Sequence, residues 1–259
     1  MGVGFSAGAS NYNGDLDGHF TLRFTRLGYG VHIAGVFSRH ITVRISYYTG
    51  TITAFDSLST AQTSYRNLNF QSKITEGAVV CIYRVFGGPR GFLPRRNLTP
   101  YVFAGIAGFD FNPQGYIYGK WVDLEPIGTE GQHLVSTTVY PKPYKLQQFS
   151  IPIGVGVFYK LTEHWDLGFE VGFRKTFTDY LDDVSTDYPN KAELFAQEGQ
   201  IAVDLSDRSG NHNNLGGHRG NASANDSYVY TNFNLTYYFY WSGKGRQGGK
   251  HGNDCPAFK

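Results

Sequence analysis

Three segments of this sequence alternate strictly between apolar and polar residues, and this alternation limits the possible folds more than any other feature. The segment 41–51 begins with Ile41, Val43 and Ile45 at every second position, and 165–177 and 229–241 follow the same rule. Period-two alternation is typical of β-strands whose two faces meet different surroundings. No apolar run approaches the ~18 residues that a membrane helix needs. The chain is therefore predicted to be all-β.

Five further segments also read as strands, although their alternation is less regular. Together the eight predicted strands are 3–12, 29–37, 41–51, 72–85, 101–111, 149–160, 165–177 and 229–241. Most have about the length of ~9–11 residues that crosses a bilayer at a tilt. The segment Lys191–Gln197 alone is expected to form a turn or two of helix, within a loop.

The connections between these strands alternate in length. Strands are joined by short turns at 38–40 and 161–164, and by a longer turn at 86–100, whereas the segments 13–28, 52–71, 112–148 and 179–227 are long and polar. Short periplasmic turns and long external loops are typical of outer-membrane barrels. We therefore expect an eight-stranded antiparallel transmembrane β-barrel over residues 1–241, with both termini in the periplasm and a periplasmic C-terminal tail over 242–259.

The sizes of the side chains indicate which face of each strand points outward. Only 17% of the residues are charged, the chain contains 33 glycines, and the polar face is made of small residues such as Gly2, Gly4, Ser6 and Gly154. Small residues suit the narrow interior of an eight-stranded barrel. Large apolar and aromatic residues on the opposite face suit lipid, so a soluble barrel with an apolar interior is disfavoured.

Four charged residues lie on the polar face of the predicted strands: Arg44, Glu76, Glu170 and Arg174. Because isolated charges are costly away from water, we expect them to pair with one another or with polar neighbours inside the barrel. A paired and filled interior disfavours an open pore. The alternative, an acid–base pair of Glu76 and Glu170, is less favoured than this charge network.

The sequence predicts no catalytic residue, no metal site and no cofactor, and its net charge of +2 does not indicate a nucleic-acid partner. Two alternatives remain open. The acidic loop Thr178–Asp183 is a weak candidate for Ca²⁺, although its spacing does not match an EF-hand. The residues Asp207, His212, His218 and Asp226 are candidates for a hydrolase site at the rim, but they lie in a run of Ser, Gly and Asn.

The two cysteines are too few for a disulfide framework. Cys81 is predicted on the lipid-facing side of a strand, and Cys255 lies in the tail, where an oxidising periplasm allows disulfides. We therefore expect Cys255 to pair with a cysteine of another chain. Since a membrane barrel must be exported, we also expect that a leader has been removed from this chain.

Several segments resemble a known family. They are TPYVFAGIAGFDFNPQ (99–114), GKWVDLEPIGTEGQ (119–132), YKLQQFSIPIGVGV (144–157), EVGFRKTFTDYLDDVST (170–186) and LSDRSG (205–210). They are similar to the PorG-like outer-membrane barrels of Bacteroidota, which belong to the type IX secretion system. The resemblance is dense from about 99 to 210 and looser elsewhere.

This resemblance implies a non-enzymatic barrel that anchors a periplasmic ring of the secretion and gliding machinery. The expected partners are a ring lipoprotein and its companion subunit, of the PorK and PorN or GldK and GldN type. The expected contact residues lie in the turn 86–98 and in the tail: Arg90, Arg95, Arg96, Cys255, Pro256 and Phe258. The alternatives are a small channel, which would conduct ions, and a rim-site hydrolase, which would depend on His212 or His218.

Overall fold

A computed structural model describes residues 1–16, 22–58, 66–86, 96–210 and 217–239 of the chain. Its strands are β1 (Gly2–Asn13), β2 (Arg26–Val36), β3 (Ile41–Phe55), β4 (Asn69–Arg84), β5 (Leu98–Ile117), β6 (Lys120–Asp123), β7 (Gln147–Lys160), β8 (Trp165–Thr176) and β9 (Ser227–Tyr238). Two helices, α1 (Lys191–Glu198) and α2 (Gln200–Ser206), follow β8, and 3-10 turns form at Leu22–Phe24, Asp56–Leu58 and Glu125–Ile127. None of the described helices is long and apolar enough to span a membrane.

Eight of these strands form a closed antiparallel barrel. Each long strand pairs with its neighbour along the chain, β5 pairs with β7, and β1 pairs with β9 to close the sheet. The short strand β6 pairs only with the end of β5, so it is a flap on the barrel and not part of its wall. The predicted eight-stranded antiparallel barrel is confirmed.

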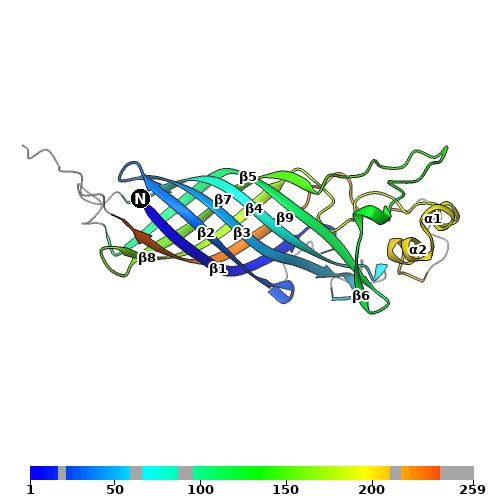
Figure 1. The fold of residues 1–259 in the computed structure, drawn as a ribbon, viewed down its shortest axis with the longest axis horizontal. Coiled ribbons are helices and arrows are strands. Elements are labelled where there is room, and N and C mark those ends of the chain that lie inside the picture. The colour runs from blue at the N-terminus through cyan, green and yellow to red at the C-terminus, as the bar shows by residue number, and fades with distance from the viewer. Residues whose placement is uncertain (17–21, 59–65, 87–95, 211–216, 240–259) are drawn as a thin grey trace, which may run out of the picture.

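The two ends of the barrel differ in their connections. The N-terminus and the turns 37–40 and 161–164 lie at one end, while α1, α2 and the long connections lie at the other (Figure 1). The last strand also ends among the short turns, where the Phe239 amide donates to the Met1 carbonyl oxygen at 2.8 Å. We call the described loops at the opposite end, 14–16, 23–25, 56–58, 66–68, 124–146, 177–210 and 217–226, the loop cap.

The structure corrects the predicted boundaries of the loops. Three strands include residues that were expected to lie in loops. The strand β3 continues to Phe55, β4 already begins at Asn69, and β5 continues to Ile117. In β4 and β5 these extensions alternate between buried and more exposed residues, and most of the more exposed ones are polar, such as Gln71, Asn112 and Gln114. They extend the barrel wall past its apolar region. The helix predicted over Lys191–Gln197 forms as α1, with the Asn190 side chain capping its first turn; α2 was not predicted.

Candidate functional site

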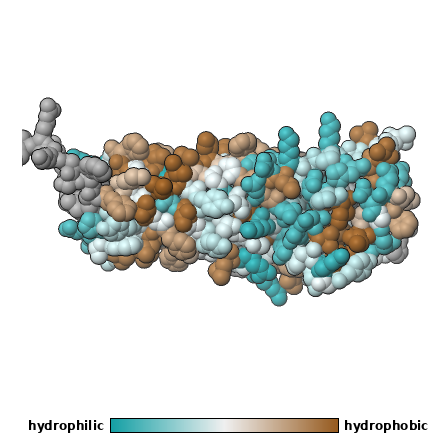
Figure 2. Space-filling view, in the orientation of Figure 1, coloured by the Kyte–Doolittle hydropathy of each residue, from teal (hydrophilic) through white to brown (hydrophobic). Residues whose placement is uncertain are grey.

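The outer surface of the barrel carries a belt of exposed apolar side chains. In β8 every outward residue from Trp165 to Phe173 is apolar and every inward one is buried. We call this surface the apolar belt; its members include Phe5, Val31, Ile33, Ile45, Val79, Val102, Ile106, Phe149, Ile153, Val155, Phe169, Val171, Phe233 and Leu235. Hydrophobic residues gather over the half of the barrel that carries the N-terminus, and hydrophilic ones over the other half (Figure 2).

The apolar belt ends at a common level on neighbouring strands. Toward the loop cap the outward positions become polar, at Thr75 and Lys73 in β4, Asp110 in β5, Gln147 in β7 and Lys175 in β8. In β7 the belt runs from Phe149 to Tyr159, about ten steps of ~3.4 Å, which at a tilt of ~45° covers roughly 24 Å. This height matches the ~25 Å apolar band of outer-membrane barrels.

The four charged residues predicted inside the barrel lie there in two ion pairs. Arg44 of β3 donates from both terminal nitrogens to Glu170 of β8, at 2.8 and 3.0 Å. The Tyr101 hydroxyl donates to the same carboxylate at 2.8 Å. All three side chains are buried. The pair therefore crosses the lumen between strands that are not neighbours in the sheet.

The second pair joins Arg174 of β8 to Glu76 of β4. The guanidinium donates to both carboxylate oxygens at 3.2 and 3.3 Å, and the Tyr228 hydroxyl donates to one of them at 2.8 Å. The guanidinium also lies over the Tyr230 ring, 4.5 Å from its centroid. We call Arg44, Glu76, Glu170 and Arg174 the lumen network; it fills the barrel interior with charges that satisfy one another.

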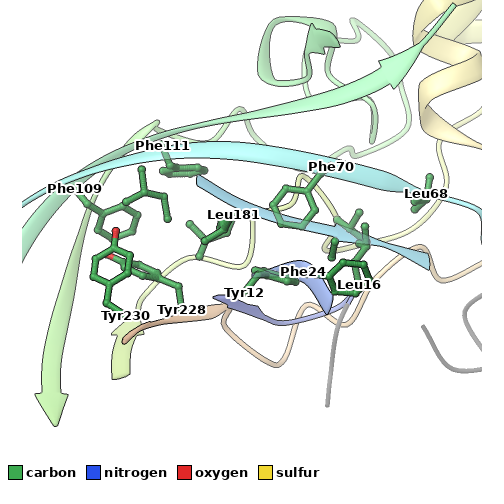
Figure 3. Packing of buried hydrophobic residues seen from close by; sticks show 14 of the residues in the cluster. Tyr12, Leu16, Phe24, Leu68, Phe70, Phe109, Phe111, Leu181, Tyr228 and Tyr230 are labelled. Carbon is green, nitrogen blue, oxygen red and sulfur yellow. The ribbon is translucent and has the colours of Figure 1, made fainter. Parts of the chain in front are cut away.

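A buried apolar cluster closes the interior on the loop-cap side of the lumen network. Strand residues such as Ile52, Phe70 and Phe111 pack there against Leu181 and Val184 of the loop between β8 and β9. Figure 3 shows Leu181 among Phe70, Phe111 and Tyr12. We call Leu16, Ile52, Phe70, Phe111, Leu181 and Val184 the apolar plug. A passage for ions would have to cross both the plug and the lumen network.

The loop cap is held together by a buried polar cluster that sequence reasoning missed. Glu130 accepts hydrogen bonds from the Ser185 amide at 2.8 Å, from the amide and hydroxyl of Thr186, and from Arg219 at 3.0 Å. Arg219 also contacts Asp183, which accepts from Tyr144 at 2.7 Å. Glu130 belongs to the segment GTEGQ, and Asp183 to FTDYLDDVS. Two of the loop signatures behind the family resemblance thus meet in one contact.

A second arginine ties this cluster to the loop between β3 and β4. Arg66 donates to both oxygens of Asp56, at 2.9 and 3.1 Å, and to the carbonyl oxygens of Asp15 and Arg219. Both arginines are buried. Loops that are far apart in the sequence are therefore joined by charge-assisted hydrogen bonds.

The acidic loop 178–183, a candidate for Ca²⁺ from the sequence, turns inward. Asp182 and Asp226 both accept from the Tyr12 hydroxyl, at 2.6 and 2.7 Å. Burial raises the pKa of Asp182, and the nearby Asp226 raises it further. Burial also raises the pKa of Asp179 to about 7, and that of Asp183 to about 6 against the opposing effect of Arg219. Among the described residues, no group of three or more acidic, histidine or cysteine side chains is arranged to hold a metal ion.

The described members of the proposed rim site lie in separate places. Asp207 pairs with Lys191 at 2.5 Å, Asp226 is buried against Tyr12, and the exposed His218 lies 2.7 Å from Asp187. His212 falls outside the described residues. The structure therefore brings together none of the described residues of that set.

Most of the predicted partner-contact residues, Arg90, Arg95, Cys255, Pro256 and Phe258, also fall outside the described residues. Arg96 is described; it is exposed at the short-turn end, where its guanidinium lies 5.1 Å from the centroid of the Phe86 ring. Cys81 is exposed on the outer face, as predicted. The aromatic pair of Trp165 and Tyr237 lies at the same end, with ring centroids 5.0 Å apart.

Residues 1–126 match the model of a family described as a domain of unknown function, DUF6089. No curated protein matches the chain.

Several solved structures are similar in fold. They include the Neisserial surface protein A (TM-score 0.44, 8% identity, 92% of this chain and 96% of that chain). The N-terminal β-barrel domain of Pseudomonas aeruginosa OprF is also similar, with a TM-score of 0.39 and 12% identity over 92% of this chain and 97% of that chain. The attachment invasion locus protein Ail of Yersinia pestis has a TM-score of 0.42 and 8% identity over 92% of this chain and 98% of that chain. The closed pairing of its strands and its apolar belt make this chain a small β-barrel of the bacterial outer membrane.

Proposed function

We propose that this protein is a non-conducting and non-enzymatic anchor in the outer membrane. The observation that carries the proposal is the filled interior, where the lumen network and the apolar plug follow one another along the barrel axis. A barrel closed in this way offers no path for a solute. The surfaces at the two ends of the barrel are then the places where a partner can bind.

For the finer role, we propose that the barrel links a periplasmic ring of the type IX secretion machinery to the membrane. The resemblance of residues 99–210 to PorG-like barrels supports this role. A second support is that β9 ends beside the short turns, at the same end of the barrel as Arg39 and Arg96. The ring lipoprotein and its companion subunit are the expected partners at that end, with lipid around the belt.

Affinity purification from native membranes tests the anchor role. The full chain, carrying an epitope tag, is expected to co-purify with the ring lipoprotein, and a variant lacking residues 242–259 is expected to lose it while keeping the heat-modifiable gel mobility of a folded barrel. Replacing Arg90, Arg95 and Arg96 with alanine tests the turn separately. Co-purification that is unchanged in both variants would rule out this docking surface, and ion conductance of the wild-type barrel would rule out the closed interior.

A further inference from the structure

A polar groove opens on the outer wall of the barrel, just above the apolar belt. It has a volume of about 490 Å³ and lies across β3, β4 and β5. We call it the outer groove; its polar lining is Thr51, Gln71, Lys73, Thr75, Asp110, Asn112 and Gln114. These strands extend past the belt here, so the groove lies at the level where lipid headgroups meet the protein.

The wall of the outer groove away from the belt is fixed by a ladder of side-chain amides. Gln71 donates to Gln114 at 3.1 Å, and Gln114 and Asn112 donate to the same oxygen of Asp123, at 2.7 and 2.9 Å. Asp123 belongs to the flap strand β6, which the ladder holds against β5. The flap therefore gives the groove a defined polar edge.

Two opposite charges line the groove without joining each other. Lys73 and Asp110 are both exposed and point outward from neighbouring strands, in adjacent rows of the β4–β5 pairing. Among the ion pairs between described residues, none includes either of them. A cation and an anion are therefore available to a ligand at the edge of the apolar belt.

Below the groove the belt contains a gap in its side chains. Gly77 and Gly108 face each other in the next outward row, directly beneath Thr75 and Asp110. A Cβ atom added at Gly77 would meet nothing within 4 Å, and one at Gly108 would meet only the Phe149 ring at 3.9 Å. Tyr47 and Phe149 flank the two glycines in the same row. An apolar depression of about 750 Å³ also reaches Gly77 from the β1–β3 side.

We propose that the outer groove binds the headgroup of a phosphoethanolamine lipid, whose acyl chain lies over Gly77 and Gly108. Lys73 and the amide of Asn112 contact the phosphate, and Asp110 accepts from the ammonium group. A cation and an anion in adjacent rows of neighbouring strands match a zwitterion better than a purely anionic lipid. This proposal depends on the position of the barrel in the bilayer and not on its role as an anchor.

Retention of lipid by the purified full chain tests the proposal. The barrel in a non-ionic detergent is mixed with dioleoyl phosphatidylethanolamine, phosphatidylglycerol or phosphatidylcholine, and bound lipid is measured by native mass spectrometry. Phosphatidylethanolamine is expected to be retained best, because the glycerol headgroup has no cation for Asp110 and the choline headgroup has no N–H donor. K73E and D110N are each expected to lower its retention about threefold, the scale of a partly exposed ion pair.

The matched control is K175E, because Lys175 is another exposed lysine at the edge of the belt but lies on β8, outside the groove. It should leave retention unchanged. Filling the gap with G77L and G108L should lower the retention of all three lipids without changing their order. Heat-modifiable gel mobility verifies the fold of each variant. Equal retention of the three lipids by the wild type, or equal losses in K73E and K175E, would overturn the proposal.

Discussion

At the scale of single residues, the lumen network shows how a narrow barrel accommodates charge. Each carboxylate accepts from an arginine and from a tyrosine hydroxyl, so Glu170 is matched by Arg44 and Tyr101, and Glu76 by Arg174 and Tyr228. A buried pair of this kind adds little net stability compared with apolar residues of the same volume. Removing one partner is different, because the other charge stays buried without compensation.

The variant E170Q is therefore expected to destabilise the barrel strongly. Loss of one member of a buried ion pair costs about 3–5 kcal/mol in the free energy of unfolding. Urea unfolding of the barrel in detergent, followed by tryptophan fluorescence, measures this change. The double variant R44M/E170L should recover much of the loss. The exposed Glu198 of α1 provides the control E198Q, and equal midpoints for E170Q and E198Q would contradict the prediction.

The members of the lumen network could be predicted from the sequence, but their pairing could not. Alternation places Arg44, Glu76, Glu170 and Arg174 on the inner face, since the faces of a strand follow from the period alone. Which arginine meets which glutamate depends on the stagger of eight strands around the barrel, and the period contains no information about it. Glu130 and Arg219 were missed altogether, because loops have no such period. Glu130 had a signal in the segment GTEGQ of the family resemblance, whereas Arg219 lies in none of the resembling segments.

At the scale of elements, the sequence determines where strands exist better than where they end. The eight strands of the wall were predicted because one face had to be apolar. The extensions of β3, β4 and β5 lie beyond the belt, where Asn112 and Gln114 replace apolar residues on the outer face. Most of their outward residues in β4 and β5 are polar, so the alternation of apolar and polar residues weakens there. The same change from apolar to polar residues on the outer face marks the edge of the bilayer.

The loop cap is expected to become less stable as the pH rises from about 4 to 7. The pKa of Asp179 is raised to about 7 and that of Asp183 to about 6, so the folded cap binds protons that the opened loops release. Stability is then greatest below the pKa of the opened state, near 4, and is lost as the pH approaches the folded pKa values. Hydrogen exchange of residues 178–186, corrected for the intrinsic rate at each pH, measures this opening.

The variant D179N should reduce this dependence on pH, because the pKa of Asp179 is raised to about 7 and that of Asp183 only to about 6. Asp207 offers a control, since its pKa is lowered by the hydrogen bond from Lys191 and from Ser209 despite the opposing effect of its burial. D207N should weaken the cap at neutral pH without flattening the slope above pH 5. A slope that is identical in the wild type and D179N would show that Asp179 does not control the opening.

At the scale of the whole molecule, the tail is expected to reach a partner by a covalent bond. The only other cysteine of the chain, Cys81, lies on the lipid-facing wall of β4, so it is poorly placed to pair with Cys255 beyond the end of β9. Non-reducing electrophoresis of native membranes should show a heavier species that disappears with reductant and in C255S. C81S is the matched control and should keep that species. Absence of any Cys255-dependent shift would contradict the crosslink.

The closed interior makes a prediction about the molecule as a channel. The wild type should show no unitary conductance in a planar bilayer, because the apolar plug and the lumen network close the barrel in series. Opening one closure alone should not suffice. The variants L181G/V184G and R44A/E76A/E170A/R174A should therefore each show no conductance, and only their combination should conduct. Each variant must first display the gel mobility of a folded barrel. Steps of conductance in the wild type would contradict the closed interior. Steps in L181G/V184G, where the ion pairs are intact, would show that the lumen network alone does not block ions.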